Sequence, residues 1–64
     1  MSPRSKKQFE AMRHESMEKI ANAALQLFGK QGFHSTSIAQ IARAAGVSKG
    51  LLYNYFESKE ALLH

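Results

Sequence analysis

The pattern of apolar and polar residues predicts a long amphipathic helix in the first half of the chain. Apolar residues recur at the 3.6-residue period that places them on one helix face, and they are Met17, Ile20, Ala21, Ala24, Leu25 and Phe28. The stretch 1–6 is polar and basic, and we expect it to be disordered. Glu15 and Glu18 early in the helix and Lys30 in its last turn would suit the helix dipole.

This helix is predicted to end near Gln31. Gly32 can adopt the left-handed conformation that closes a helix, because it has no Cβ. Phe33 can then pack back on Phe28 inside the helix end. The polar residues 34–36 are expected to form a short loop before the next helix.

A second helix is predicted to begin at Ile38. Ser37 and Gln40 form the pattern S-x-x-Q, a capping box in which the two residues bond each other's backbone amides. Apolar residues follow at helical spacing, namely Ile38, Ile41, Ala42 and Ala45. Gly46 is expected to end this helix after about two turns.

A third, short helix is predicted over about 49–55. Ser48 is its N-cap, since a Ser hydroxyl can accept a hydrogen bond from a free amide of the first turn. The buried side of this helix consists of Leu52 and Phe56, four residues apart, with Tyr55 partly alongside. A helix this short is not stable alone, so it depends on packing against the others.

Two short helices joined by a tight turn describe a helix-turn-helix. Gly46 would supply the positive φ of the turn, and the small Ala42 would let the following helix cross closely. Four apolar residues would fill the interface, and they are Ile41, Ala45, Val47 and Leu52. The alternative interpretation is a helical hairpin that is packed for structure alone.

The remaining residues predict the start of a fourth helix. Ser58 is its N-cap and Glu60 lies in its first turn, and the chain reaches His64 while this helix is still beginning, so we expect a longer protein. The predicted fold is all-α: a three-helix bundle with a helix-turn-helix, homeodomain-like, plus the start of a fourth helix. The arm and the start of the first helix occupy 1–14, and the helix-turn-helix domain occupies 15–64.

Charge and composition limit the partners and the compartment. The chain has nine Lys and Arg against five Asp and Glu, a net charge of +4 and a pI near 9.8. The excess lies mainly in 1–14, which hold four bases and one acid. A basic arm indicates nucleic acid or an acidic membrane surface, although a solvated tail has the same composition. There is no cysteine, no apolar run of the roughly 20 residues that span a bilayer, and no signal-peptide core, so we expect an intracellular protein.

The predicted third helix carries residues suited to reading DNA. Gly50 in its first turn costs about 0.8–1 kcal/mol against Ala, a cost that a purely structural helix would avoid. Lys49 can donate to guanine O6 and N7, and Asn54 can pair with adenine N6 and N7. The Tyr53 hydroxyl can donate to a phosphate.

These residues lie in a stretch that resembles the N-terminal domain of the TetR family of bacterial transcriptional regulators. The resemblance covers most of the chain and rests on IANAALQLF at 20–28, TSIAQIA at 36–42, AGVSKGLLYNYF at 45–56 and SKEAL at 58–62. Members of the family often have an acidic residue where Gln40 stands, so a weaker cap is expected here. They often have His in place of Tyr55, so that contact is expected to differ.

The resemblance implies a homodimer whose two recognition helices enter successive major grooves of a palindromic operator in double-stranded DNA. It implies a transcriptional repressor of the bacterial cytoplasm, associated with the nucleoid. A small-molecule effector would bind a larger C-terminal domain, absent from this chain, through which the dimer also forms. No enzyme activity, cofactor, metal or membrane partner is expected.

Carried over position by position, the resemblance places Lys49 and Gly50 at base edges. Mixed base and phosphate contacts are implied at the flanking residues Ser48, Leu51, Asn54 and Tyr55. Phosphate contacts are implied at Thr36, Ser37, Tyr53 and Lys59.

Three other classes of function are alternatives. A small helical protein–protein interaction module would use the Leu51, Tyr53 and Tyr55 patch and would bind its partner without DNA. A membrane-surface peptide would use the basic arm, but the weak amphipathic pattern before Met17 disfavours it. An enzyme is least favoured, because the three histidines share no metal-ligand spacing and Ser48 has no acid–base partner.

Overall fold

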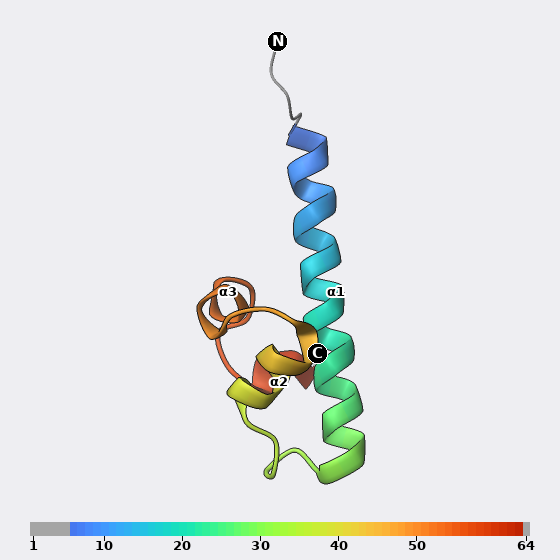
Figure 1. Ribbon diagram of the computed structural model, residues 1–64, viewed down its shortest axis with the longest axis vertical. Helices are drawn as coiled ribbons and strands as arrows, with labels where there is room; N and C mark the ends of the chain where they lie inside the picture. The colour runs from blue at the N-terminus through green and yellow to red at the C-terminus, as the bar shows by residue number, and fades with distance from the viewer. Residues whose placement is uncertain (1–5, 64) are drawn as a thin grey trace.

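The computed structural model describes the backbone of residues 6–63 and the side chains of residues 13–63. The expectation of disorder at 1–6 falls almost wholly outside these residues. The described part contains helices and no strand, so the all-α prediction is confirmed (Figure 1). Its elements in order are α1 (Lys6–Gln31), α2 (Ile38–Ala45), α3 (Lys49–Tyr55) and the short 3₁₀ helix η1 (Glu60–Leu63).

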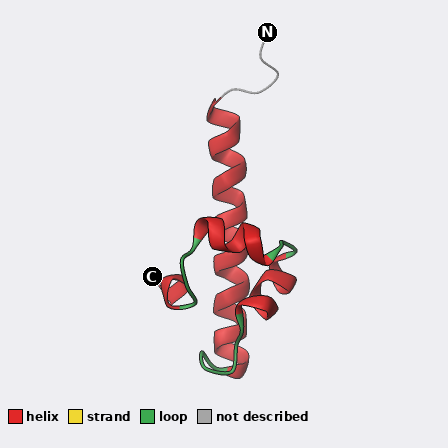
Figure 2. Cartoon of the chain, turned by 90° about the vertical axis from the view of Figure 1, so that its left-hand side faces the viewer, coloured by secondary structure: helices red, strands yellow, loops and turns green. Residues whose placement is uncertain are grey.

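The longest element is α1, and α2, α3 and η1 lie on the same side of it (Figure 1). Of these, α2 and η1 pack against α1, and α3 packs mainly against α2. Figure 2 shows α3 crossing in front of α1, with α2 beside the crossing and η1 on the other side. Because α1 begins at Lys6, Glu15 and Glu18 lie in its middle, and its first turn holds no acidic residue. Their predicted dipole role is therefore wrong, while Lys30 does lie in the last turn.

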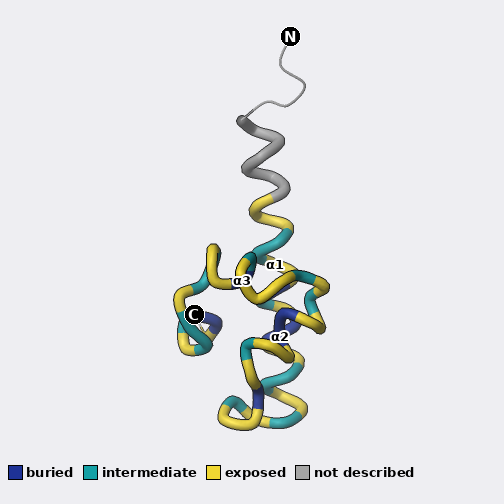
Figure 3. The backbone as a smooth tube through the Cα atoms, turned by 60° about the vertical axis from the view of Figure 1, so that its left-hand side comes forward, coloured by how far each residue is buried: buried dark blue, intermediate teal, exposed yellow. Residues whose placement is uncertain are grey.

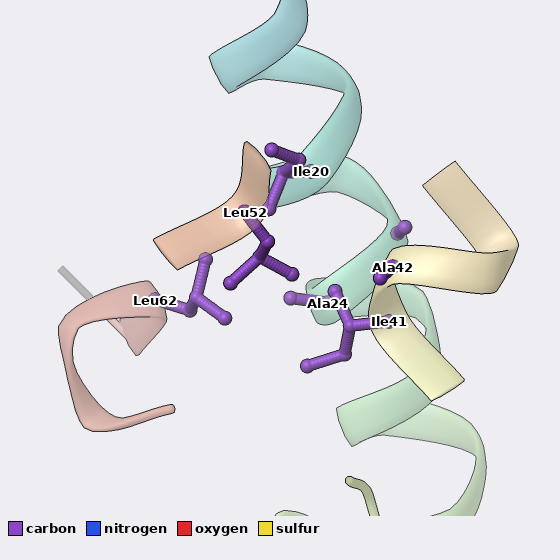
Figure 4. Packing of buried hydrophobic residues seen from close by; sticks show 7 residues of the cluster. Ile20, Ala24, Ile41, Ala42, Leu52 and Leu62 are labelled. Carbon is purple, nitrogen blue, oxygen red and sulfur yellow. The ribbon is translucent and has the colours of Figure 1, made fainter. Parts of the chain in front are cut away.

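Every element contributes to one small apolar core. Its buried members are Ile20, Ala23 and Ala24 of α1, Ile41 and Ala42 of α2, Leu52 of α3 and Leu62 of η1. Figure 4 shows the Leu52 side chain between Leu62 and Ile41. The core therefore joins α2, α3 and η1 to α1.

The predicted core face of α1 is partly wrong. Leu25 is 58% exposed, whereas Ala23, which was not assigned to that face, is buried. At 3.6 residues per turn, Leu25 is rotated by about 140° from the fully buried Ile20, but Ala23 is rotated by only about 60°. The spacing identified the right helix and period, but only packing against α2 decided which edge of the apolar face is covered.

The predicted helix ends are confirmed. Gly32 has φ +90°, its amide donates to the Phe28 carbonyl at 2.9 Å, and the Phe28 and Phe33 ring centroids lie 5.0 Å apart. At the start of α2 both bonds of the capping box between Ser37 and Gln40 are present.

The turn between α2 and α3 is also as predicted. Gly46 has φ +75°, and its amide donates to the Arg43 carbonyl at 3.1 Å. The Val47 amide donates to the Ala42 carbonyl at 2.9 Å, which completes the usual two-bond closure of a helix. Ser48, two residues after Gly46, is the N-cap of α3, so this turn fixes where α3 begins.

The segment after α3 is a 3₁₀ turn where the start of an α-helix was predicted. The Leu62 amide donates to the Lys59 carbonyl at 3.1 Å, and the predicted cap is present because Ser58 Oγ accepts from the Ala61 amide at 3.3 Å. A 3₁₀ turn is common where an α-helix begins or ends. Among residues 6–63, no helix combines the length and the apolarity needed to cross a membrane.

Leu52→Ala should lower the free energy of unfolding by about 2–5 kcal/mol, because it removes a fully buried side chain. The matched control is Leu25→Ala, the same change at an exposed position, which should alter stability by no more than about 0.5 kcal/mol. Urea unfolding followed by circular dichroism measures both. Equal losses for the two variants would contradict the core described above.

Gly46→Ala should cost about 1–2 kcal/mol, because a Cβ resists the left-handed backbone of the turn. No atom lies within 4 Å of the added Cβ, so the whole loss would come from the backbone. The control is Gly29→Ala inside α1, where space is also open and Ala should stabilise the helix by about 0.4–1 kcal/mol. Thermal unfolding should therefore shift in opposite directions, and a shared direction would refute the strain argument.

Candidate nucleic-acid interface

The outer face of α3 is open to solvent. Lys49, Gly50, Tyr53 and Asn54 are exposed, and Tyr53 is 49% exposed although its ring is large. Figure 3 shows α3 mostly in the yellow of exposed residues. Their spacing of one, four and five residues keeps them on one side of the helix, opposite the buried Leu52. The structure thus brings together four of the ten predicted site residues as one continuous surface.

Two further predicted residues, Leu51 and Tyr55, flank this surface and are half-buried. The Tyr55 ring packs against the core, and the Arg13 guanidinium of α1 lies 5.8 Å from its centroid. Sequence reasoning did not find this contact, because 42 positions separate the two residues and no local pattern connects them. Tyr55 therefore links the open face of α3 to α1.

Gly50 has no structural reason to be a glycine. A Cβ built on it would meet only Ser48 Oγ, at an ordinary contact distance of 3.9 Å, and its φ is not positive. Alanine would therefore fit and would favour the helix. What the glycine provides is a flat spot in the first turn of α3, where an external group can approach the backbone closely.

Ser37 and Ser48 are both exposed and both act as N-caps. Ser37 Oγ accepts from the Gln40 amide at 3.1 Å, and Ser48 Oγ accepts from the Leu51 amide at 3.0 Å. Each hydroxyl keeps its own hydrogen as a donor, so capping and a phosphate contact are compatible. The first helical bond of α2 is Ile41 to Ser37, which leaves the amides of Ile38 and Ala39 ahead of it.

Thr36 does not join this surface, and its predicted phosphate contact has no support in the geometry. It is only 2% exposed, and its hydroxyl donates to the Gly32 carbonyl at 2.7 Å. Its amide donates to the Phe33 carbonyl at 3.2 Å. Both donors are committed to the loop between α1 and α2, so the structure gives Thr36 the role of holding that loop.

Lys59 is also engaged within the protein. Its Nζ donates to the Phe33 carbonyl at 2.7 Å and lies 4.3 Å from the centroid of the Phe33 ring. The residue is half-buried, unlike the exposed Lys49. A phosphate contact at Lys59 stays a prediction, and it would have to coexist with these two interactions.

Gln31 and Gln40 form a bond that the sequence reasoning missed. Gln31 Nε2 donates to Gln40 Oε1 at 2.9 Å and to the Ser35 carbonyl at 3.0 Å. The expected weakness of a cap with Gln at position 40 is therefore offset by a second donor to the same oxygen. In the sequence, Gln31 and Gln40 are only two polar residues nine positions apart, and they come into contact only because the loop between α1 and α2 folds back.

The charge around α2 and α3 is one-sided. Residues 19–56 contain four bases and no Asp or Glu, and two of the bases, Arg43 and Lys49, are exposed on the helix pair. No acidic side chain of α2 or α3 therefore repels a polyanion from this surface. Across the residues that are described, no group of three His, Asp or Glu residues is placed to hold a metal ion.

Comparison with known proteins agrees with these features. Residues 16–64 match the family described as bacterial regulatory proteins, tetR family. The chain is 48% identical over 50 residues to the uncharacterized HTH-type transcriptional regulator YerO of Bacillus subtilis, covering 78% of this chain and 17% of that protein. No solved structure gives a significant match.

Two further relatives have functional names. The HTH-type transcriptional regulator HbdR of Aromatoleum sp. is 49% identical over 49 residues, 77% of this chain and 21% of its own length. The HTH-type transcriptional regulator UidR of Escherichia coli is 47% identical over 45 residues, 70% of this chain and 23% of its own length. The chain thus spans about a fifth of the length of these relatives, which are named as transcriptional regulators. On the match over 16–64 and the helix-turn-helix described above, the chain belongs to the tetR family of bacterial regulatory proteins.

Proposed function

We propose that this chain reads the sequence of double-stranded DNA, with α3 lying in the major groove, and that it regulates transcription in this way. The observation that carries the proposal is Gly50, a glycine without a structural role at the centre of an exposed helical face. A major groove about 12 Å wide admits one α-helix, and the absence of a side chain at Gly50 lets the bases approach its backbone.

The exposed face of α3 supplies the chemistry for base recognition. Lys49 is suited to guanine O6 and N7, and Asn54 to adenine N6 and N7. Leu51 and Tyr55 would contribute mixed contacts at the edges of the face. Tyr53 would donate its hydroxyl to a phosphate.

Phosphate contacts would fix the position of α3 in the groove. Ser37 and Ser48 are exposed at the N-termini of α2 and α3, where the helix dipole and free amides favour an anion. The absence of acidic residues over 19–56 supports the same partner. Thr36 is left out of this proposed set because its donors are occupied.

The finer features of the proposal follow the family. The chain would form one of two reading heads in a homodimeric repressor that binds a palindromic operator in the bacterial cytoplasm, at the nucleoid. Two half-sites one helical turn apart, about 34–36 Å, would place both α3 helices on the same side of the duplex. Dimer contacts and a small-molecule effector site would lie in the part of the relatives' length that this chain does not span.

Lys49→Ala should weaken binding by about 1–3 kcal/mol and relax the base preference at one position, because it removes a base contact. Selection from randomised duplexes at low salt, where single-head binding is strongest, measures the preference of both proteins. Lys30→Ala, another exposed lysine, is the control and should retain the preference. Failure of the parent chain to enrich any duplex would refute the proposed function and favour a protein-interaction module.

Gly50→Ala should separate stability from DNA binding. The variant should be about 0.5–1 kcal/mol more stable, because Ala favours a helix and the Cβ fits without strain. Its affinity for the selected duplex should fall, because the new methyl group stands where the bases approach. Thermal unfolding and a binding titration measure the two effects, and unchanged affinity would show that the flat spot has no role in recognition.

A further inference from the structure

Arg13 is a positive charge of α1 that lies beside the last residue of α3. Its guanidinium carbon is 5.8 Å from the centroid of the Tyr55 ring, within the range of a cation–π contact. The Arg13 side chain is exposed, whereas Tyr55 is half-buried and ends α3. The proposed function uses Tyr55 but gives this neighbouring charge no role.

The register of α1 places Arg13 on the side of the helix that faces the core. Arg13 precedes the fully buried Ile20 by seven residues, which returns it to within about 20° of Ile20 around the helix and moves it about 10 Å along the axis. Figure 1 shows α1 running past α3 toward the N-terminus. Arg13 therefore stands where α1 leaves the core and passes the end of α3.

The described acidic side chains do not neutralise Arg13. Among these side chains the only ion pair joins His14 and Glu18, whose Nδ1 and Oε1 atoms are 3.0 Å apart. At 3.6 residues per turn, Glu15 and Glu18 lie about 160° and 140° around α1 from Arg13. Glu57 is exposed just beyond α3 and forms no ion pair with Arg13. The described acids thus leave the guanidinium facing solvent beside α3.

The position of Arg13 complements the phosphate contact proposed at the start of α3. Ser48 caps one end of α3, and Tyr55 lies at the other end, about 10 Å away along the helix axis. The major groove is about 12 Å wide and is bordered by two phosphate backbones, so the two ends of α3 would approach different phosphates. A cation beside Tyr55 is suited to the second of these phosphates.

We propose that Arg13 binds a phosphate of the DNA backbone at the C-terminal end of α3, and that the Tyr55 ring holds the guanidinium ready for this contact. The inference rests on the proposed function and extends its site from the helix pair to α1. The contact with the ring uses the charge of Arg13, so its N–H groups can still donate to phosphate oxygens. A side chain that is held over a ring also loses less freedom on binding than one that moves freely in solvent.

Arg13→Gln tests the phosphate contact, because it keeps a long polar side chain and removes the charge. One phosphate contact contributes about 0.9 to the slope of log affinity against log salt, so the slope for the selected duplex should fall by that amount. The ratio of parent to variant affinity should then be about 3.5-fold larger at 50 mM than at 200 mM salt. Lys30→Gln is the matched control, since it removes an exposed charge about 25 Å away along α1, and its slope should stay near the parent value.

Further variants separate the two members of the pair, after thermal unfolding has defined a temperature at which every variant is folded. Arg13→Lys should restore the slope and most of the affinity, because a lysine also binds phosphate. Arg13→Gln should cost the same affinity in a Tyr55→Phe background, which keeps the ring, and less in a Tyr55→Leu background, which removes it. Equal costs in these two backgrounds would overturn the role of the ring.

Neutral backbone positions in the DNA test the contact from the other side. A methylphosphonate at a single position of the selected duplex removes one negative charge. One such position should weaken binding of the parent chain and leave binding of Arg13→Gln unaffected, because the variant no longer uses that phosphate. If every position affects the two proteins equally, Arg13 binds no phosphate and the proposal is wrong.

A salt slope for Arg13→Gln that falls no more than that for Lys30→Gln would also overturn the proposal. Lower thermal stability with full affinity would do the same, because Arg13 would then only support Tyr55 within the fold. In both cases the parent chain would still select a duplex, so the proposed function would stand. If the parent chain enriches no duplex, the proposed function itself fails and the inference fails with it.

Discussion

The structure depends on the burial of one side chain, Leu52. The helix that carries it has seven residues, too few to be stable alone, and Leu52 is its only fully buried residue. The Gly46 turn and the Ser48 cap fix where α3 starts, and Leu52 then fixes which way it faces. Because Ile20, Ile41 and Leu62 surround Leu52, α1, α2 and η1 are aligned by the same contact.

Local patterns predicted most of the fold. The C-terminal end of α1, both ends of α2 and the start of α3 followed from caps and glycines, since Gly32, Gly46, Ser37 and Ser48 act through neighbours within four residues. The edge of the core on α1 could not be predicted, because a 3.6-residue period does not say which side of a broad apolar face meets α2. Leu25 was misplaced for this reason.

The candidate site likewise has one part that local sequence patterns predict and one part that they do not. The open face of α3 followed from spacing within one short helix, and the structure places Lys49, Gly50, Tyr53 and Asn54 as expected. Thr36 and Lys59 were assigned by resemblance, yet their donors face other parts of the protein. Such contacts cross 4 to 26 residues and exist only once the loop after α1 is closed, so no sequence spacing predicts them.

The open face of α3 and its buried side are carried by different residues of the same helix. Lys49, Gly50, Tyr53 and Asn54 are exposed, while Leu52 is buried in the core and Tyr55 packs against it, so the four exposed positions contribute little to the packing of the fold. Substitutions at these positions therefore cost little stability, and many combinations of side chains can be displayed on the same folded helix. Under the proposed function, single substitutions would change the preferred DNA sequence while each variant still folds.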